Sequence, residues 1–401
     1  MLMFAGSRND QQVATRARRA ANRANMTPPE AIPAPAAGAH PLGLYLERNE
    51  RKIAIWAFVA GFVFDIFTFE RVDSWFGIGQ QILYLAVITA ALTQILLEDG
   101  KPRTDLDRMF AATRWYYQYR TAIIHFFFGS LLNLYTIYFF KSSSLLVSFS
   151  FLAVLVLLLA ANESRRFKSL GLAFKFALLS LCYLSFFAHV VPVFVGSIGL
   201  TVFLLSILLG CLPLIVVGWG IRTYTPDFFA QTRRQIVVPL GLVLVGFLAF
   251  YLFRLIPPVP LSLPFIGVYH GVERTRDSYR LSHERPYWRV WHNGDQWFHA
   301  QPDDKVYVFF RIFSPTRFSD QVQLRWYWKD VARGWVLHDT IPINILGGRE
   351  RGFRGYGVKA NYQPGHWKVQ VETTDGREIG RIYFRLEAVP AAPRSFVIDT
   401  E

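Results

Sequence analysis

Residues 236–263 read IVVPLGLVLVGFLAFYLFRLIPPVPLSL and divide the chain into two kinds of sequence. The first part, residues 236–255, is almost entirely apolar over the roughly 20 residues that an α-helix needs to cross a bilayer. The second part, residues 256–263, is rich in proline and therefore extended, which is typical of a domain boundary. The stretch predicts membrane helices before the boundary and a water-soluble domain after it.

Upstream of the boundary, the chain is almost continuously apolar from Ile53 and is broken only by short charged loops. Hydrophobic residues make up 52% of the 401 residues, so lipid is expected to solvate much of the chain. We predict seven transmembrane helices, at residues 53–69, 77–97, 121–140, 144–161, 172–190, 196–219 and 236–255. The fifth and sixth stretches run together, and we divide them at Pro192 because one helix of that length would overshoot the bilayer.

The net charge of +14 is distributed in a way that predicts orientation. The segments on one side of the predicted bundle are the tail 1–52 and the loops 98–120, 162–175 and 220–235, and they hold twenty Lys and Arg. The opposite side receives three, Arg71, Lys141 and Arg254. Because cytoplasmic segments carry such an excess, we predict a cytoplasmic N-terminus and, with seven spans, a periplasmic C-terminal domain. This bias accounts for the basic charge without a nucleic-acid partner.

Three regions follow from these patterns. Residues 1–52 are predicted to be a basic, Pro- and Ala-rich cytoplasmic tail, mostly disordered, which reinforces orientation and whose arginines also suit anionic lipid. Residues 53–256 are the predicted seven-helix transmembrane domain, and residues 257–401 the predicted periplasmic β-sandwich domain. Cys182 and Cys211 both fall in apolar spans, so the periplasmic domain is expected to contain neither a disulfide nor a Cys-based metal site.

Beyond the boundary, the hydrophobic pattern changes from helical to alternating. Residues 306–313 and 322–329 alternate in the manner of half-buried strands. Asp375-Gly376 lies between two further such stretches, 366–373 and 377–386, and predicts a β-hairpin because both turn residues tolerate positive φ. The predicted fold class is an α-helical polytopic membrane bundle of about seven helices, followed by an all-β domain that forms an immunoglobulin-like antiparallel sandwich.

Residues 324–386 carry a series of short motifs. In order, they are Arg325-Trp326-Tyr327-Trp328, Ile343-Asn344-Ile345, Gly347-Gly348-Arg349-Glu350-Arg351-Gly352-Phe353-Arg354-Gly355-Tyr356 with Lys359, Pro364-Gly365-His366-Trp367-Lys368-Val369, and Asp375-Gly376-Arg377-Glu378-Ile379-Gly380-Arg381-Ile382-Tyr383-Phe384. The series resembles the bacterial domain-of-unknown-function family 2914, which often ends multi-span membrane proteins. The resemblance implies a bacterial inner-membrane protein with a periplasmic end, and it implies no activity.

A cluster of basic residues among glycines is the first candidate site. Its members are Arg349, Arg351, Arg354, Tyr356 and Lys359. Guanidinium groups on a flexible backbone suit carboxylate or phosphate, and therefore an anionic lipid headgroup or an acidic polymer. The alternative is a glycine-rich strand and turn with solvated charges.

Polar residues within the predicted spans are the second candidate. They are Asp65, His125, Asn133 and His189. Ionisable groups inside a membrane are costly, so they could form a proton or ion path. The alternative is that Asp65 reaches the headgroups or pairs with Arg71, while the others hydrogen-bond neighbouring helices.

The periplasmic domain contains two further features with open readings. Residues 287–298 are dense in aromatic side chains, which would stack on glycan sugar rings if exposed and form core if buried; core is the favoured reading. Six of the nine histidines also lie in this domain, and we expect them to be exposed in loops. No Gly-x-Ser-x-Gly elbow, phosphate loop or His-Glu-x-x-His signature appears, so no catalytic residue, cofactor or metal ligand is predicted.

Two functional hypotheses remain. The first is a membrane-anchored binding or scaffolding module that contacts an envelope component: a periplasmic protein, a glycan or an anionic lipid. The alternative is a membrane-embedded transporter or lipid-modifying enzyme with a periplasmic regulatory domain. The lipid bilayer is the one partner common to both, and the oligomeric state is not predicted.

Overall fold

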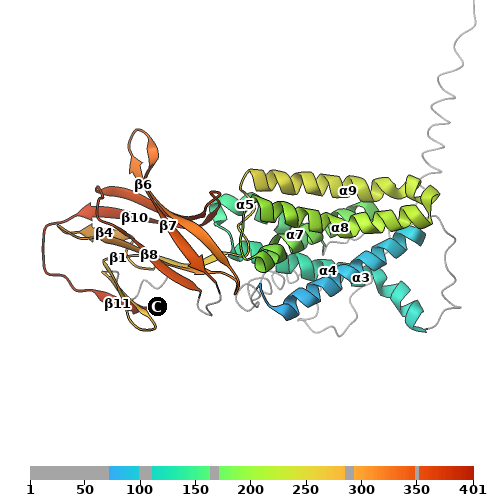
Figure 1. The fold of residues 1–401 in the computed structure, drawn as a ribbon, viewed down its shortest axis with the longest axis horizontal. Coiled ribbons are helices and arrows are strands. Elements are labelled where there is room, and N and C mark those ends of the chain that lie inside the picture. Colours follow the sequence, from blue (N-terminus) through green and yellow to red (C-terminus); the bar gives the residue numbers. More distant parts are fainter. Residues whose placement is uncertain (1–71, 99–110, 163–170, 285–292, 348–351) are drawn as a thin grey trace, which may run out of the picture. The chain divides into compact units, whose positions relative to one another are not determined.

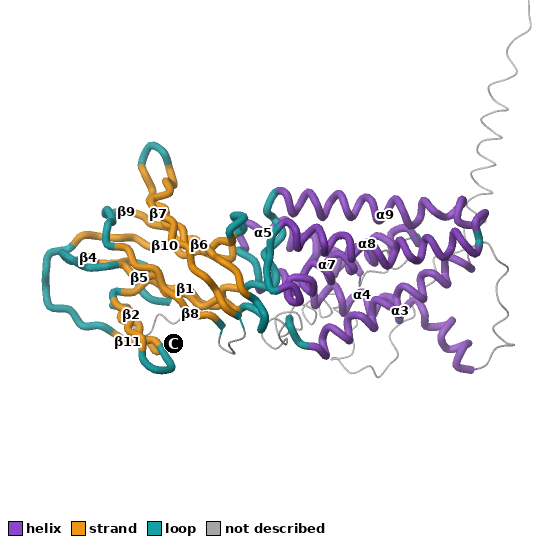
Figure 2. The backbone as a smooth tube through the Cα atoms, viewed as in Figure 1, coloured by secondary structure: helices purple, strands orange, loops and turns teal. Residues whose placement is uncertain are grey.

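The structure, a computed structural model, describes residues 72–98, 111–162, 171–284, 293–347 and 352–401 (Figure 1). All of these residues belong to one compact unit, Phe64–Glu401. The described secondary structure is helical as far as Leu252 and consists of strands from Ser262 onward (Figure 2). The predicted tail, residues 1–52, and the first predicted span, residues 53–69, lie outside the described residues.

Six helices occur in the part of the chain that the structure describes. They are α3 (Trp75–Glu98), α4 (Ala111–Lys141), α5 (Leu145–Asn162), α7 (Leu172–Val195), α8 (Leu200–Tyr224) and α9 (Pro226–Leu252). Five of them are long and apolar enough to cross a membrane, whereas the apolar stretch of α5, Val147–Ala161, is shorter. Several helices therefore have the length and composition of membrane spans.

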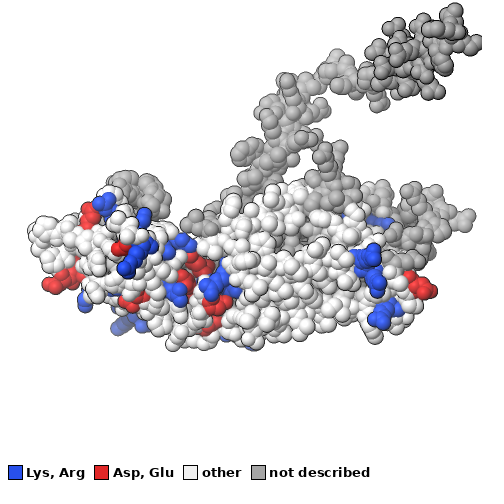
Figure 3. All heavy atoms as spheres, turned by 90° about the horizontal axis from the view of Figure 1, so that it is seen from above, with Lys and Arg blue, Asp and Glu red and all other residues white. Residues whose placement is uncertain are grey.

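Large apolar side chains cover the outside of these helices. Phe126, Leu208 and Leu242 are 65%, 64% and 70% exposed, an arrangement that water disfavours and that lipid tails do not. On the face drawn in Figure 3, uncharged atoms cover most of the helical part, and Lys and Arg gather near one end of it. The surface pattern thus agrees with the composition of the spans.

The break between the fifth and sixth predicted spans falls at glycines, so the division at Pro192 was wrong by about one turn. Pro192 lies inside α7. Gly196 then adopts a left-handed conformation with φ of 79°, and its N–H donates to the Pro192 carbonyl at 2.8 Å. Helices commonly end this way because glycine has no Cβ to clash at positive φ. A proline near the end of a helix, in contrast, is compatible with the turn that follows it.

Eleven strands make up the described C-terminal part. They are β1 (Ser262–Tyr269), β2 (Gly271–Arg274), β3 (Tyr279–His283), β4 (Trp297–Ala300), β5 (Val306–Phe313), β6 (Ser319–Asp330), β7 (Gly334–Leu346), β8 (Phe353–Lys359), β9 (Gly365–Thr373), β10 (Glu378–Ala388) and β11 (Val397–Thr400). The strands predicted at 306–313 and 322–329 are confirmed as β5 and β6. The predicted hairpin is confirmed as β9 and β10, with φ of 79° at Gly376.

The strands form three sheets, with orders β1-β5-β8, β4-β10-β9-β6-β7 and β11-β3-β2. All strand pairs are antiparallel except β4 with β10, which is parallel. One hydrophobic core joins the first two sheets, because inward side chains of β5 such as Phe310 and of β6 such as Trp326 belong to the same buried cluster. Both side chains are fully buried. The described part of the C-terminal domain is therefore all-β, and apolar packing stabilises it.

The β9–β10 hairpin contacts the end of α9 through Arg377. The guanidinium carbon of this buried residue lies 3.5 Å from the centroid of the Tyr251 ring. Its nitrogens donate to the carbonyls of Tyr251 and Ile256 at 3.2 and 3.4 Å, and Nε pairs with Asp375 at 2.8 Å. Cation–π and charge-assisted contacts of this kind are strong when water is excluded. They link the last helix to the all-β domain.

Candidate functional site

An open groove of about 280 Å³ lies on the five-stranded sheet. Its lining residues are Gln296, Trp297, Lys329, Trp335, His366, Trp367, Tyr383, Phe384 and Arg385. The alternation of β10 explains the arrangement, because Phe384 points into the core while its neighbours Tyr383 and Arg385 point outward. The register then aligns outward residues of different strands: Arg385 lies opposite Trp297 of β4 and His366 of β9.

Three aromatic side chains of the groove are open to solvent. Trp297, Tyr383 and Trp335 are 57%, 41% and 37% exposed. The rings of Trp335 and Tyr383 lie 5.7 Å apart, so they form a continuous aromatic surface. Large exposed aromatic groups that share one hollow are typical of binding surfaces, since a folded core gains nothing from them there.

Cationic side chains lie over these rings. The Arg385 guanidinium carbon is 5.3 Å from the Trp297 ring centroid, and the Lys329 ammonium is 5.9 Å from that of Trp335. Lys368 lies 4.1 Å from the Tyr327 ring and 5.3 Å from Trp335, and burial together with the charge of Arg381 lowers its pKa. The groove therefore combines aromatic faces with positive charge.

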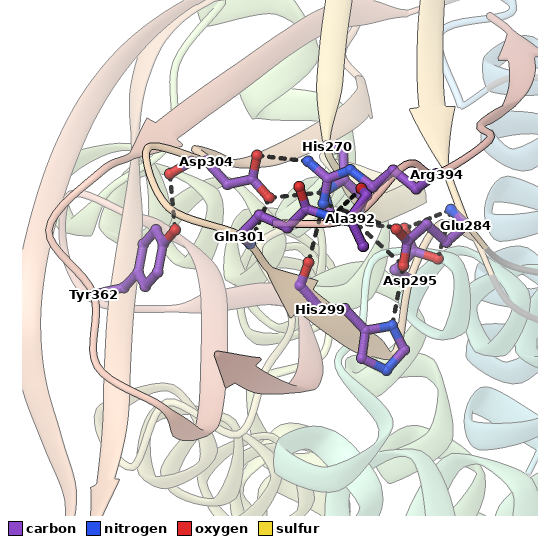
Figure 4. Close-up of polar contacts among 9 residues, drawn as sticks. All are labelled: His270, Glu284, Asp295, His299, Gln301, Asp304, Tyr362, Ala392 and Arg394. Atoms are coloured by element: carbon purple, nitrogen blue, oxygen red, sulfur yellow. Dashed lines mark hydrogen bonds and ion pairs between the residues drawn. The ribbon is translucent and has the colours of Figure 1, made fainter. Parts of the chain in front are cut away.

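A second feature is a polar cluster around His270, between β1 and β2 (Figure 4). The imidazole is 3% exposed, and it stacks on Phe298 with ring centroids 3.9 Å apart. Its Nε2 lies 3.6 Å from Asp295 and 3.9 Å from Glu284, and its Nδ1 lies 3.8 Å from Asp304. Neither ring nitrogen has a hydrogen-bond partner among the described atoms. Carboxylates thus surround the ring at distances slightly beyond hydrogen bonding.

Arg394 fastens the segment before β11 to this cluster. Its guanidinium donates to Asp304 at 2.6 Å and to the His299 carbonyl at 3.2 Å. Burial alone would raise the pKa of Asp304, but the hydrogen bond and charge of Arg394 outweigh it and hold that pKa below its ordinary range. Asp304 also lines an adjoining cavity of about 590 Å³, together with Gln301 and Tyr362.

Burial lowers the pKa of His270 from its ordinary 6.5 to about 4, although Glu284 and Asp304 act in the opposite direction. His270 is therefore neutral near neutral pH. Within the described residues, no group of three or more His, Cys, Asp or Glu side chains is arranged to hold a metal ion. We interpret the cluster as a structural element that connects the edges of several strands.

Acidification should destabilise the fold through His270. Because the folded-state pKa lies below the unfolded value, the unfolded chain takes up a proton that the folded chain does not. The free energy of unfolding should fall by up to about 3 kcal/mol as the pH drops from above 6.5 to below 4. Chemical unfolding of the full-length protein in detergent, at several pH values, measures this. His270→Gln should reduce the dependence of the unfolding free energy on pH, whereas His338→Gln, at an exposed histidine, should preserve it. The same pH dependence in the wild type and in both variants would contradict the assignment of this effect to His270.

Comparison with known families identifies part of this domain. The family model described as "Protein of unknown function (DUF2914)" matches residues 319–386, which extend from β6 to β10. The C-terminal region carries a DUF2914 module. This confirms the resemblance predicted over 324–386, and the DUF2914 module supplies every lining residue of the groove except Gln296 and Trp297.

No curated protein matches the chain. Among solved structures, a β-glucosidase from Listeria innocua in complex with glucose is 11% identical, over 23% of this chain and 15% of its own, with a TM-score of 0.18. An immunoglobulin-like protein from Pseudomonas aeruginosa is 10% identical over 32% of this chain and 98% of its own, with a TM-score of 0.20. An alkylpurine DNA glycosylase from Pseudomonas fluorescens is 10% identical over 80% of this chain and 100% of its own, with a TM-score of 0.21.

The predicted basic cluster is only partly described. Arg349 and Arg351 lie outside the described residues. Arg354 and Tyr356 lie on one face of β8 in the DUF2914 module, and Tyr356 is 42% exposed. Lys359 lies on the other face, where it is buried and its ammonium group is 3.3 Å from the Asp339 carboxylate. The Arg354 guanidinium donates to the backbone carbonyls of Glu401 and Asp277. Anion binding by these five residues stays a prediction.

Three of the four predicted intramembrane residues lie in described helices. Asp65 lies outside the described residues, and His125 and Asn133 lie on α4. His189 of α7 is buried, and its Nδ1 is 2.8 Å from the Ser185 carbonyl. The His189 ring packs beside Tyr135 and Tyr138 of α4. Tyr135 follows His125 by ten residues, roughly 15 Å along α4 at 1.5 Å per residue, so His189 lies beside a part of α4 that is distant from His125. A shared pathway also stays a prediction.

The predictions for the aromatic segment 287–298 and for the histidines of the C-terminal domain are confirmed only in part. Residues 287–292 lie outside the described residues, whereas Trp297 is exposed in the groove and Phe298 is fully buried. The expectation of exposed loop histidines was wrong for His270 and His283. His283 is fully buried on β3 and lies 3.0 Å from Asp399. Sequence reasoning missed both the groove and the cluster around His270 because their members come from distant segments.

Proposed function

We propose that this chain is a multi-pass protein of the bacterial inner membrane whose all-β domain is a periplasmic binding or scaffolding module. The apolar helices, the DUF2914 module and the twenty-to-three bias of basic residues support this proposal. The observation that carries it is the groove: three exposed aromatic side chains in one hollow, with cations over two of them. The partner is an envelope component.

Seven spans and an immunoglobulin-like sandwich are parts of this proposal. The stretch 53–69 and the six described helices make seven if α5 counts as a span. α5 has 18 residues, about 27 Å at 1.5 Å per residue, close to the hydrocarbon thickness of a thin bilayer. A core shared between two facing sheets supports the sandwich. An odd number of spans puts the two ends of the chain on opposite sides of the membrane.

Site-specific photocrosslinking in intact bacteria tests the binding role. A photoreactive amino acid at Tyr383 should form an adduct with an envelope component, and Trp297→Ala should weaken that adduct. Tyr356 is the matched control, since it is 42% exposed against 41% for Tyr383 but lies on the other sheet. Equal adducts from both positions, or none from Tyr383, would overturn the proposal for the groove. Capture from Tyr356 alone would move the site to the basic cluster.

The alternative, a transporter or lipid-modifying enzyme, gains less support from the described residues. One cavity adjoins the ends of α7, α8 and α9 and measures about 40 Å³. Its lining is mainly apolar and includes the charged side chain of Arg377. A substrate pocket usually measures roughly 300 to 1,000 Å³. This cavity is of a size for water.

A further inference from the structure

We propose that the groove of the DUF2914 module and β4 binds an acidic polysaccharide, a chain of sugar rings that carry carboxylate groups. The inference rests on the proposed function, because it requires this face of the domain to meet envelope polymers. It goes further by assigning a ligand class from the shape, the aromatic faces and the charge of the groove.

The aromatic side chains of the groove suit the sugar rings of the proposed ligand. A pyranose ring presents one apolar C–H face, which packs well on an exposed aromatic face while its hydroxyl groups remain solvated. Trp297 lies at one end of the groove on β4, and Trp335 lies at the start of β7, two strands beyond β9 in the sheet order. Tyr383 stands between them on β10. The platforms therefore extend across the sheet, as successive rings of a polymer require.

The charged side chains of the groove favour a ligand with negative charge. Among the described residues, the groove is lined by Lys329, His366 and Arg385 and by no carboxylate. Glu387 pairs with Arg385 at 2.9 Å, but both side chains are partly exposed, at 35% and 47%, and a guanidinium has five donors. The remaining donors suit a sugar carboxylate.

The openness of the site favours a polymer over an enclosed small molecule. The groove holds about 280 Å³ and is bordered by side chains that are themselves exposed. Bases of single-stranded nucleic acid also stack on aromatic side chains near cations. We favour a glycan because the domain is proposed to be periplasmic, and nucleic-acid binding is an outcome that the test distinguishes.

Binding to defined polymers tests the inference with the full-length protein in detergent. The probes are polygalacturonate as acidic glycan, dextran as neutral glycan and oligo(dT) as single-stranded DNA, followed by tryptophan fluorescence. Polygalacturonate should bind most tightly. Trp297→Ala and Trp335→Ala should each weaken it about tenfold, since stacking contributes energies of that order. Lys329→Gln with Arg385→Gln should weaken it about tenfold or more and reduce its salt dependence.

Two variants outside the groove control for non-specific effects. Phe396→Ala removes an aromatic ring that is 39% exposed, and Arg280→Gln removes a half-exposed cation on β3; both should bind like wild type. Unchanged thermal unfolding of the groove variants excludes misfolding, and Trp297→Phe should retain most binding.

Dextran or oligo(dT) binding as tight as polygalacturonate would overturn the assignment to acidic glycans. If no probe binds while Tyr383 still forms its adduct in cells, the ligand class is wrong and the proposed function stands. If the adduct is also missing, both fail.

Discussion

Gly294→Ala is expected to abolish the folded state of the all-β domain under conditions in which the wild type is stable. A Cβ atom at this position would lie 2.0 Å from the Val268 carbonyl oxygen and 2.8 Å from the Val268 nitrogen, both backbone atoms. The residue also has φ of 66°, which L side chains adopt at a cost of about 1–2 kcal/mol. The two effects together should lower the free energy of unfolding by more than about 4 kcal/mol.

The reason for so large an effect is the position of Gly294 in the fold. It forms a bridge to Val268 of β1, and the next residue, Asp295, donates its N–H to the Val268 carbonyl at 2.8 Å. Displacing this contact moves Asp295 away from His270 and shifts the start of β4. Chemical unfolding of the full-length protein in detergent measures the change.

Gly334→Ala is the matched control. Gly334 has φ of 73° at the start of β7, but an added Cβ would meet no atom within 4 Å. The expected cost is about 1 kcal/mol, from backbone strain alone. If both alanine variants unfold at the same denaturant concentration, the close approach of Val268 and Gly294 is not a feature of the protein.

Much of the fold could be predicted because its elements are long and strongly patterned. Six of the seven predicted spans coincide with described helices, and the alternating pattern located β5, β6 and the β9–β10 hairpin. The break after α7 was misplaced because a proline is visible in the sequence as a helix breaker. Local sequence does not show that Gly196 adopts a left-handed conformation, or that a Cβ atom there would lie 2.4 Å from the distant Arg317 carbonyl oxygen. The parallel pairing of β4 with β10 joins segments nearly 90 residues apart, and local sequence carries no signal for it.

The candidate sites could be predicted less well, because their residues come from segments that are distant in the sequence. Sequence reasoning grouped residues that are close in the chain, and Arg354 and Lys359 then appear on opposite faces of β8 because side chains alternate along a strand. The groove and the cluster around His270 are assembled from distant strands. The aromatic density of 287–298 did point to Trp297, although its partners Trp335 and Tyr383 come from other strands.

The second large effect concerns the side of the membrane from which the all-β domain can be reached. The chain has two cysteines, Cys182 and Cys211, and both are buried in apolar helices, so serine at both positions gives a background without reactive thiols. Val331 is fully exposed in the turn between β6 and β7, and Tyr224 is 86% exposed at the end of α8. Under the proposed topology, Val331→Cys and Tyr224→Cys report on opposite sides of the membrane.

Labelling of these two variants by a membrane-impermeant maleimide, in bacteria whose outer membrane alone is permeabilised, tests the central claim most directly. We predict that Val331→Cys is labelled fully before lysis and that Tyr224→Cys is labelled only after it. The reverse pattern would contradict the proposal of a periplasmic binding module. Labelling of both before lysis would contradict the number of spans on which it depends.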